Sequence, residues 1–163
     1  MPKAFISEDD IEQSILDKLE EEHLGYNILR LDPSPEKMNT LPDGTGRSDK
    51  KECILLDVLW KSLKKLNPTV EDKYLKEVYD TLRADYTETD INQTNYDLYK
   101  KIREGVKVTF TNKQGIDDFF FIKLVDFDNP ENNDFTAVSQ MWIKGKIIWR
   151  RPDILIFING MPM

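Results

Sequence analysis

The sequence predicts an α/β fold, in which a mostly helical first part is followed by a part rich in strands. Over residues 1–105, apolar side chains recur at a spacing of about 3.6 residues, which is typical of helices with one buried face. From residue 106 onward they alternate at a spacing of about 2, which is typical of strands. The chain has 163 residues, 39% of them hydrophobic, which suits one globular core. We therefore expect a single domain over residues 1–163, helical over about 1–105 and sheet-forming over about 106–163.

The first helix is expected to begin after Ser7. Ser7 followed by Asp10 is typical of an N-terminal cap, and an acidic first turn suits the helix dipole. Apolar residues then recur at helical spacing, namely Ile11, Ile15, Leu16 and Leu19. Gly25 is expected to stop this helix. A short strand over 26–31 and a loop over 32–47 follow, and the loop is expected to be mobile because it holds three prolines and two glycines.

Three further helices are expected before the strands begin. Ser48 is expected to cap the second helix, which has an apolar face and ends at Asn67-Pro68. The third helix is expected over 71–84 and the fourth over about 90–104, where Gly105 ends it.

The strands of the second part are expected over 106–110, 118–127, 135–143, 147–149 and 154–158. Ile154–Ile158 is an uninterrupted apolar run, which indicates a strand buried on both faces. Asn159-Gly160 predicts a type I′ hairpin turn, because both central residues of that turn need positive φ. A second strand should follow such a turn, and this sequence offers only Met161–Met163 for it. We therefore expect a longer natural chain that continues as an apolar strand.

The charge and the rare residues limit the possible functions. The formal net charge is -7, with a pI near 4.8, which is the wrong sign for a protein that coats nucleic acid by itself. A nuclease whose DNA is held by other domains stays possible. Cys53 and His23 are the only cysteine and histidine, so four-ligand Cys/His zinc sites are excluded. Any metal would need carboxylate ligands, which suit a hard ion such as Mg2+.

No apolar run reaches the roughly 18 residues that a membrane helix needs. The start of the chain, Met1-Pro2-Lys3, lacks the apolar core of a signal peptide. We therefore expect a cytoplasmic protein without a membrane partner.

One aspartate stands at the mouth of the last apolar strand. Asp153 follows Pro152 directly and precedes Ile154, so the end of a sheet would hold it rigidly. A divalent ion can bridge such a carboxylate and a phosphate, and can lower the pKa of an attacking water. A second acidic group and a lysine usually complete a site of this kind. On spacing alone, the commoner alternative is an aspartate that only begins a strand.

Two segments of the chain closely resemble type I restriction enzyme R subunits. They are LVDFDNPENNDFTAVSQ, from Leu124 to Gln140, and RRPDILIFINGMP, from Arg150 to Pro162. The opening helix after Ser7 fits the start of the same family, as does Arg47-Ser48-Asp49. The resemblance runs over nearly the whole chain, in order. It implies a PD-(D/E)XK nuclease domain with a restriction-endonuclease-like fold, in which helices flank a mixed central sheet.

The resemblance also implies which residues form the site. Asp153 matches the family's aspartate that binds metal, and Glu12 is the best match for an acidic residue of the first helix that supports the metal. Glu12 could equally be a plain surface glutamate. The family carries a Glu-x-Lys pair on the following strand, and this sequence ends before any such pair.

Three further residues are candidates for contact with DNA. Arg150 and Arg151 flank Asp153 and could meet phosphates, or could neutralise nearby carboxylates. Gln140 could lie near the active site, or could face solvent from a strand.

The implied activity belongs to a longer protein. A type I R subunit cuts unmodified double-stranded DNA with Mg2+, together with methylation and specificity subunits. No G-x-x-x-x-G-K-[ST] phosphate loop occurs here, so ATP would act only through motor domains absent from this chain. The 163 residues by themselves are expected to be inactive. Two alternatives remain, a non-catalytic module with a degenerate nuclease fold that contacts DNA or docks subunits, and a stand-alone nuclease of the same superfamily. The residues that follow Met163 would discriminate between them.

Overall fold

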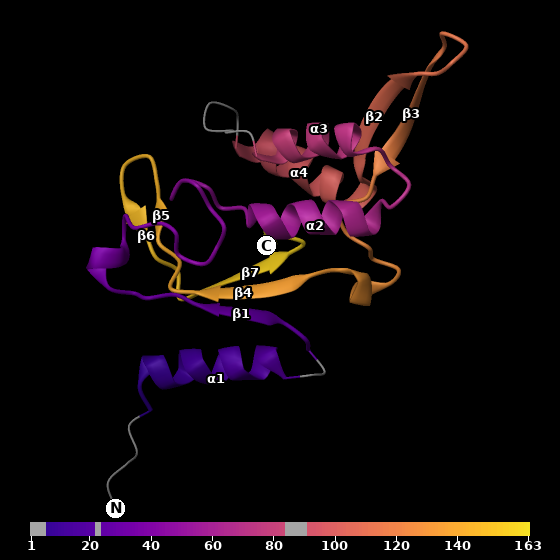
Figure 1. Ribbon diagram of the computed structural model, residues 1–163. Coiled ribbons are helices and arrows are strands. Elements are labelled where there is room, and N and C mark those ends of the chain that lie inside the picture. Colours follow the sequence, from indigo (N-terminus) through magenta and orange to yellow (C-terminus); the bar gives the residue numbers. More distant parts are fainter. Residues whose placement is uncertain (1–5, 22–23, 84–90) are drawn as a thin grey trace, which may run out of the picture. The chain divides into compact units, whose positions relative to one another are not determined.

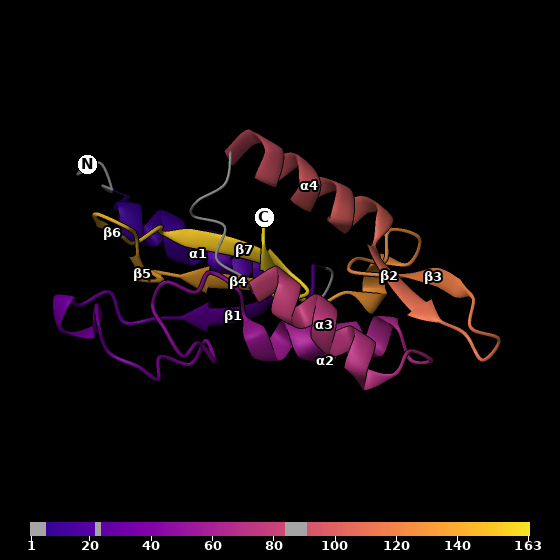
Figure 2. The same ribbon diagram turned by 90° about the horizontal axis from the view of Figure 1, so that it is seen from above.

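The computed structural model describes residues 6–21, 24–83 and 91–163 (Figures 1 and 2). The helices are α1 (Glu8–Glu20), α2 (Leu56–Leu66), α3 (Asp72–Arg83) and α4 (Ile91–Glu104). The strands are β1 (Asn27–Arg30), β2 (Val106–Thr111), β3 (Asp117–Ile122), β4 (Phe135–Ser139), β5 (Ile143–Lys144), β6 (Trp149–Arg150), β7 (Ile154–Ile158) and β8 (Met161–Pro162). The chain divides into two compact units, one of residues up to Leu56 together with Asp134–Met163, and one of Asp57–Asn133.

The first unit is built on a four-stranded mixed sheet in the order β1-β4-β7-β8. β1 runs parallel to β4, whereas β4 and β7 pair antiparallel, as do β7 and β8. The short strands β5 and β6 form a separate antiparallel pair. The expected α/β fold with a mixed sheet is therefore confirmed.

The buried apolar side chains of this sheet lie on β4, with one more on each of β7 and β8, where Met161 is 3% exposed. Ala137, Val138 and Phe157 are completely buried. The expectation that all of Ile154–Ile158 is buried on both faces was wrong, because the other four residues of β7 are only half-buried. The pairing explains the difference, since β8 pairs only with Phe157 and Ile158.

Helix α1 runs along one face of this sheet (Figure 1). The capping box is confirmed, because the backbone N–H of Asp10 donates to Ser7 Oγ at 3.1 Å and the N–H of Ser7 donates to the Asp10 carboxylate at 2.9 Å. The buried residues of the helix are Glu12 and Leu16, which are four positions apart and share one face. A carboxylate thus lies on the buried face, one turn before the buried leucine.

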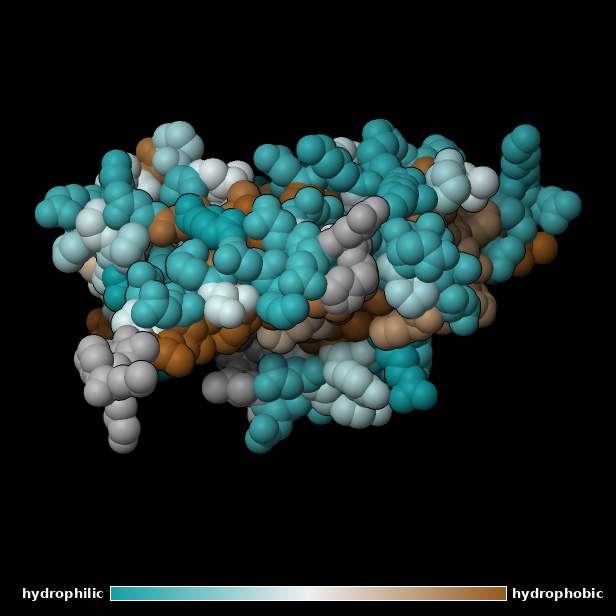
Figure 3. All heavy atoms as spheres, turned by 90° about the horizontal axis from the view of Figure 1, so that it is seen from below, coloured by the Kyte–Doolittle hydropathy of each residue, from teal (hydrophilic) through white to brown (hydrophobic). Residues whose placement is uncertain are grey.

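Two isoleucines of α1 lie on its outer side. Ile11 is 52% exposed and Ile15 is 46% exposed, so the helical spacing of apolar residues does not predict which of them are buried. Figure 3 views the molecule from the side of α1 and shows hydrophobic side chains at the surface among hydrophilic ones.

The second unit contains α3, α4, most of α2 and the hairpin of β2 and β3. The two strands pair antiparallel from Val106↔Ile122 to Thr111↔Asp117. Tyr74 of α3 meets Phe120 of β3 edge to face, with ring centroids 5.3 Å apart. Trp60 of α2 meets Tyr79 of α3 in the same way, at 5.7 Å.

Some of the expected boundaries were wrong for local reasons. The strand expected over 118–127 ends at Ile122, because the backbone of Lys123 is bonded to a side chain instead of a strand. Asn67 Oδ1 accepts the N–H of Lys123 at 2.8 Å, and Asn67 Nδ2 donates to its carbonyl at 2.9 Å. Helix α2 begins at Leu56 rather than after Ser48, because the Glu52 carboxylate accepts the backbone N–H of Ser48 and folds that segment into a turn.

The strand expected over 135–143 was also too long. It ends at Ser139, because Gln140 has a φ of 57° and cannot continue a strand. The strand expected over 147–149 is β6, at Trp149–Arg150. Position 84 of the expected third helix and position 90 of the expected fourth lie outside the described residues.

The hairpin turn at Asn159-Gly160 is confirmed. The φ values are 52° and 81°, and β7 and β8 pair on either side. Asn159 is completely buried, and it ties the turn to the start of β4. Its Oδ1 accepts the N–H of Asp134 at 2.7 Å, and its own N–H donates to the Asp134 carbonyl at 2.8 Å.

None of the helices within the described residues is long and apolar enough to span a membrane.

The turn residue Asn159 should matter for stability through two separable effects. Asn159→Ala should lower the free energy of unfolding by about 2–4 kcal/mol, because it removes the acceptor for the Asp134 N–H and because alanine adopts a positive φ less readily than asparagine, whose polar side chain can bond locally. Asn159→Gly adopts the positive φ readily but loses the hydrogen bond to the Asp134 N–H, so it should cost less, about 1–3 kcal/mol. Urea unfolding of the three proteins measures both values. Equal stabilities for all three would contradict this account of the turn.

Candidate functional site

The candidate site lies where β4 ends and β7 begins. The register pairs Ser139 with Ile154, and the next contact is the N–H of Gln140, which donates to the Asp153 carbonyl at 2.9 Å. The ladder therefore extends one step beyond the regular strands. It places Gln140 and Asp153 beside each other at one end of the sheet.

Helix α1 brings a second carboxylate to the same place. Gln140 Nε2 donates to Glu12 Oε2 at 2.6 Å and lies 3.4 Å from Asp153 Oδ1. Glu12 is only 8% exposed, because it shares the inward face of α1 with Leu16. One amide nitrogen thus bridges two carboxylates that come from opposite ends of the chain.

The oxygen atoms at this site suit a hard divalent cation. Glu12 and Asp153 offer carboxylate oxygens, which are the ligands that Mg2+ prefers. Among the residues that the structure describes, Gln140 Oε1 is buried and has no hydrogen-bond partner. In the same described part of the chain, no three histidine, cysteine, aspartate or glutamate residues are close enough to hold a metal together. Glu12 and Asp153 are therefore the two carboxylates that this region offers to a cation.

The two arginines next to Asp153 have different surroundings. Arg151 donates from Nη1 to the carbonyl of Pro33 at 2.6 Å, and its guanidinium lies 5.1 Å from the ring centroid of Trp142. Arg150 belongs to β6, where it pairs with Ile143 and is exposed. The structure therefore uses Arg151 to connect two loops and leaves Arg150 on the surface.

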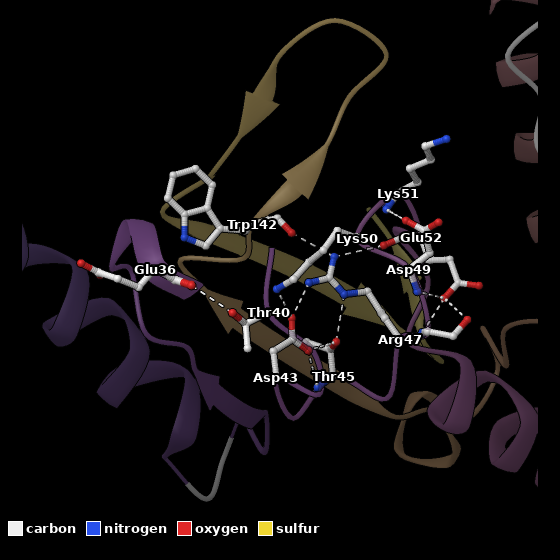
Figure 4. A network of polar contacts seen from close by, with 11 residues as sticks. Glu36, Thr40, Asp43, Thr45, Arg47, Asp49, Lys50, Lys51, Glu52 and Trp142 are labelled. Atoms are coloured by element: carbon white, nitrogen blue, oxygen red, sulfur yellow. Dashed lines mark hydrogen bonds and ion pairs between the residues drawn. The ribbon is translucent and has the colours of Figure 1, made fainter. Parts of the chain in front are cut away.

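A second polar cluster lies in the loop that was expected to be mobile (Figure 4). The Asp43 carboxylate accepts from Arg47 Nη2 at 2.6 Å, from Lys50 Nζ at 2.7 Å and from the hydroxyl of Thr45. The side chain of Arg47 is completely buried, and that of Lys50 is nearly so. Because such charges are costly to bury unless they are paired, these ion pairs hold the loop in one arrangement.

This second cluster also supports the chain that follows Gln140. Arg47 Nη1 donates to the carbonyls of Glu52 and Trp142, at 3.2 and 3.1 Å. The N–H of Lys144 donates to the carbonyl of Lys50 at 3.0 Å. Sequence reasoning missed this cluster. The sequence signal for this cluster is weak, because it consists only of Asp43, Arg47 and Lys50 at spacings of four and three residues in and after a Gly-rich loop.

The two clusters border one pocket of about 170 Å³. Its wall includes Arg30 and Lys37, Asp43 and Lys50 of the second cluster, and Gln140 and Trp142. Gln140 therefore lies between the carboxylate pair and an open space.

The environment of Asp43 changes its acidity. Burial by itself would raise the pKa of this carboxyl. The hydrogen bonds donated by Lys50, Thr45 and Arg47 outweigh burial and hold the pKa of Asp43 well below its usual range.

The fold and the site together define a class of protein, namely α/β domains that can offer carboxylate ligands to a divalent cation at one end of a mixed sheet. A comparison of the sequence with known protein families identifies the family within this class. The family described as "Type I restriction enzyme R protein N terminus" matches residues 5–163, and the chain belongs to this family.

Two curated relatives agree with this assignment. The type I restriction enzyme HindI endonuclease subunit of Haemophilus influenzae is 30% identical over 163 residues, covering 98% of this chain and 14% of the relative. A Methanocaldococcus jannaschii protein, provisionally named type I restriction enzyme MjaIXP endonuclease subunit, is 30% identical over 127 residues, covering 75% of this chain. The chain spans 14% and 12% of the lengths of these two relatives.

The low pKa of Asp43 predicts how stability depends on pH. A carboxyl whose pKa is lower in the folded state stabilises the fold above its unfolded pKa, which is about 3.9, and this stabilisation fades as the pH falls below it. At pH 7, Asp43→Asn should cost about 3 kcal/mol of unfolding free energy, because it leaves Arg47 and Lys50 without their counter-ion. At pH 3 the difference from the wild type should be clearly smaller.

Urea unfolding at pH 7 and pH 3 tests this expectation, with Asp128→Asn as the control. Asp128 is exposed, so its variant should match the wild type at both pH values. A cost of Asp43→Asn that is equal at the two pH values would contradict a lowered pKa at Asp43.

Proposed function

We propose that this chain is the N-terminal nuclease region of the restriction subunit of an ATP-dependent type I restriction-modification enzyme. In the full-length protein, this region would cut unmodified double-stranded DNA with Mg2+. The observation that carries the proposal is that the carboxylates of Glu12 and Asp153 both lie within hydrogen-bond distance of Gln140 Nε2. Membership of the R protein N-terminal family supports it independently of that geometry.

In the proposed mechanism, Glu12 of α1 and Asp153 at the start of β7 would hold Mg2+. The ion would stabilise charge on the scissile phosphate and make a water molecule more acidic. The protein's own contribution is to fix the two carboxylates. Glu12 is fixed because its helix buries Leu16 within the same unit, and Asp153 is fixed because its carbonyl accepts a hydrogen bond from the N–H of Gln140.

The charge of the chain makes it dependent on other parts of the enzyme for DNA binding. A net charge of -7 repels phosphates overall, so we propose that the rest of the subunit and its partners deliver the DNA. Arg150, exposed on β6, is the arginine placed to meet a phosphate. Arg151 would act indirectly, by holding Pro33 and Trp142 in place. The proposed partners are the methylation and specificity subunits, and the proposed location is the cytoplasm, with ATP bound outside residues 1–163.

The central prediction concerns Asp153 in the full-length subunit. Asp153→Ala should reduce DNA cleavage by at least about a thousandfold, because it removes one of the two carboxylates that hold the metal. DNA-stimulated ATP hydrolysis should stay within about twofold of the wild type, since ATP binds elsewhere. Both rates are measured on the same assembled enzyme, with circular dichroism to verify the fold.

Asp128→Ala is the matched control, because it removes an exposed aspartate of the second unit and should change neither rate. Unchanged cleavage in Asp153→Ala would favour the alternative, a non-catalytic module that contacts DNA or docks subunits. Loss of both activities in a folded variant would also count against Asp153 as a dedicated nuclease ligand.

Residues 1–163 by themselves should not cut DNA. The family resemblance implies a Glu-x-Lys pair after Asp153, and neither residue type occurs at positions 154–163. Incubation of supercoiled plasmid with the purified chain and Mg2+, followed by gel electrophoresis, should show no more nicking than the Asp153→Ala chain. Efficient nicking that this substitution removes would show that the described carboxylates suffice.

A further inference from the structure

Gln140 occupies the position between the two carboxylates where a cation would bind. Its Nε2 lies 2.6 Å from Glu12 Oε2 and 3.4 Å from Asp153 Oδ1. An amide NH2 group carries two partly positive hydrogens, so it can offset the repulsion between two carboxylates in the way that a cation does. For the same reason, the amide nitrogen and a cation cannot both lie between these oxygens.

The backbone of Gln140 is held independently of its side chain. Its N–H bonds to the Asp153 carbonyl at 2.9 Å, and its φ of 57° ends β4. The next residues are anchored as well, because Arg47 donates to the Trp142 carbonyl at 3.1 Å. A change in the contacts of the Gln140 amide would therefore need only side-chain rotations.

A destination for the displaced amide lies next to it. Within the part of the chain that the structure describes, two buried side-chain polar atoms have no hydrogen-bond partner, Gln140 Oε1 and Trp142 Nε1. One is an acceptor and the other is a donor, and both residues line the pocket of about 170 Å³. A Gln140 side chain that turned into this pocket would bring the two unpaired groups toward each other, and buried polar groups without partners are costly.

We propose that Gln140 is a built-in competitor for the divalent cation, which bridges Glu12 and Asp153 before the cation binds and turns toward Trp142 when it does. Gln140 is then a positioning residue. It keeps the carboxylates together in the unloaded chain, and it sets how readily they accept the cation. The inference rests on the proposed function, because it takes Glu12 and Asp153 as the ligands.

The proposal makes an unusual prediction, namely that removing a polar residue from the site strengthens cation binding. Gln140→Asn and Gln140→Gly both tolerate positive φ, and neither side chain can reach both carboxylates. Both variants lose the bridge to the two carboxylates in the unloaded chain, whereas in the loaded chain they lose only a contact between two neutral groups, which is the weaker interaction. Each variant should bind Mn2+, a spectroscopic substitute for Mg2+, about tenfold more tightly than the wild type, which corresponds to about 1.4 kcal/mol.

The affinities are measured on the 163-residue chain by titration with Mn2+, using electron paramagnetic resonance to follow the free ion. Asp153→Ala is the control and should bind at least about tenfold more weakly than the wild type. Thermal unfolding is the second measurement. With a chelator present, both Gln140 variants should unfold at a lower temperature than the wild type, and saturating Mn2+ should narrow that gap, because the tighter binder gains more stability.

Each result has a defined meaning. Weaker Mn2+ binding in both Gln140 variants would make Gln140 a ligand and overturn the proposal, and unchanged binding would make it only structural and overturn the proposal as well. These results leave the proposed function intact as long as Asp153→Ala weakens binding. Binding that Asp153→Ala does not affect would instead refute the proposed cation site.

Discussion

Antiparallel pairing of β4 with β7 holds the first unit together, and contacts at both of its ends continue the pairing beyond the strands. At one end, Asn159 exchanges hydrogen bonds with Asp134 and fixes the hairpin turn. At the other end, the N–H of Gln140 meets the carbonyl of Asp153. Because a slip of one residue would turn every side chain to the opposite face, this register decides that Gln140 and Asp153 lie together.

The site depends on that pairing and on the burial of one helix face. Leu16 is completely buried, and Glu12, one turn earlier on the same face, is carried to the end of the sheet with it. Two carboxylates that approach each other repel, so the fold needs a compensating group. In the described structure that group is the Gln140 amide, and in the proposed function it is a cation. The same position between the carboxylates is therefore taken by the amide in the described structure and by the cation in the proposed function.

The ion pairs of Asp43 connect this site to the rest of the unit. Arg47 and Lys50 neutralise Asp43 in the interior and contact the backbone around Trp142 and Lys144. The pocket between the two clusters is lined by the paired Asp43 and Lys50 on one side and by Gln140 and Trp142 on the other. The chain belongs to the R protein N-terminal family and spans 14% of the length of one curated relative.

The sequence by itself determined the features that depend on neighbouring residues. It predicted the cap at Ser7, the turn at Asn159-Gly160 and the change from helices to strands, because propensity and periodicity are local. The resemblance pointed to Glu12, Gln140 and Asp153 as separate candidates. Only the tertiary structure decided that these three meet, that α2 begins at Leu56 and that the loop before it holds buried ion pairs. Hydrogen bonds and ion pairs between side chains depend on three-dimensional distance, which one-dimensional spacing does not contain.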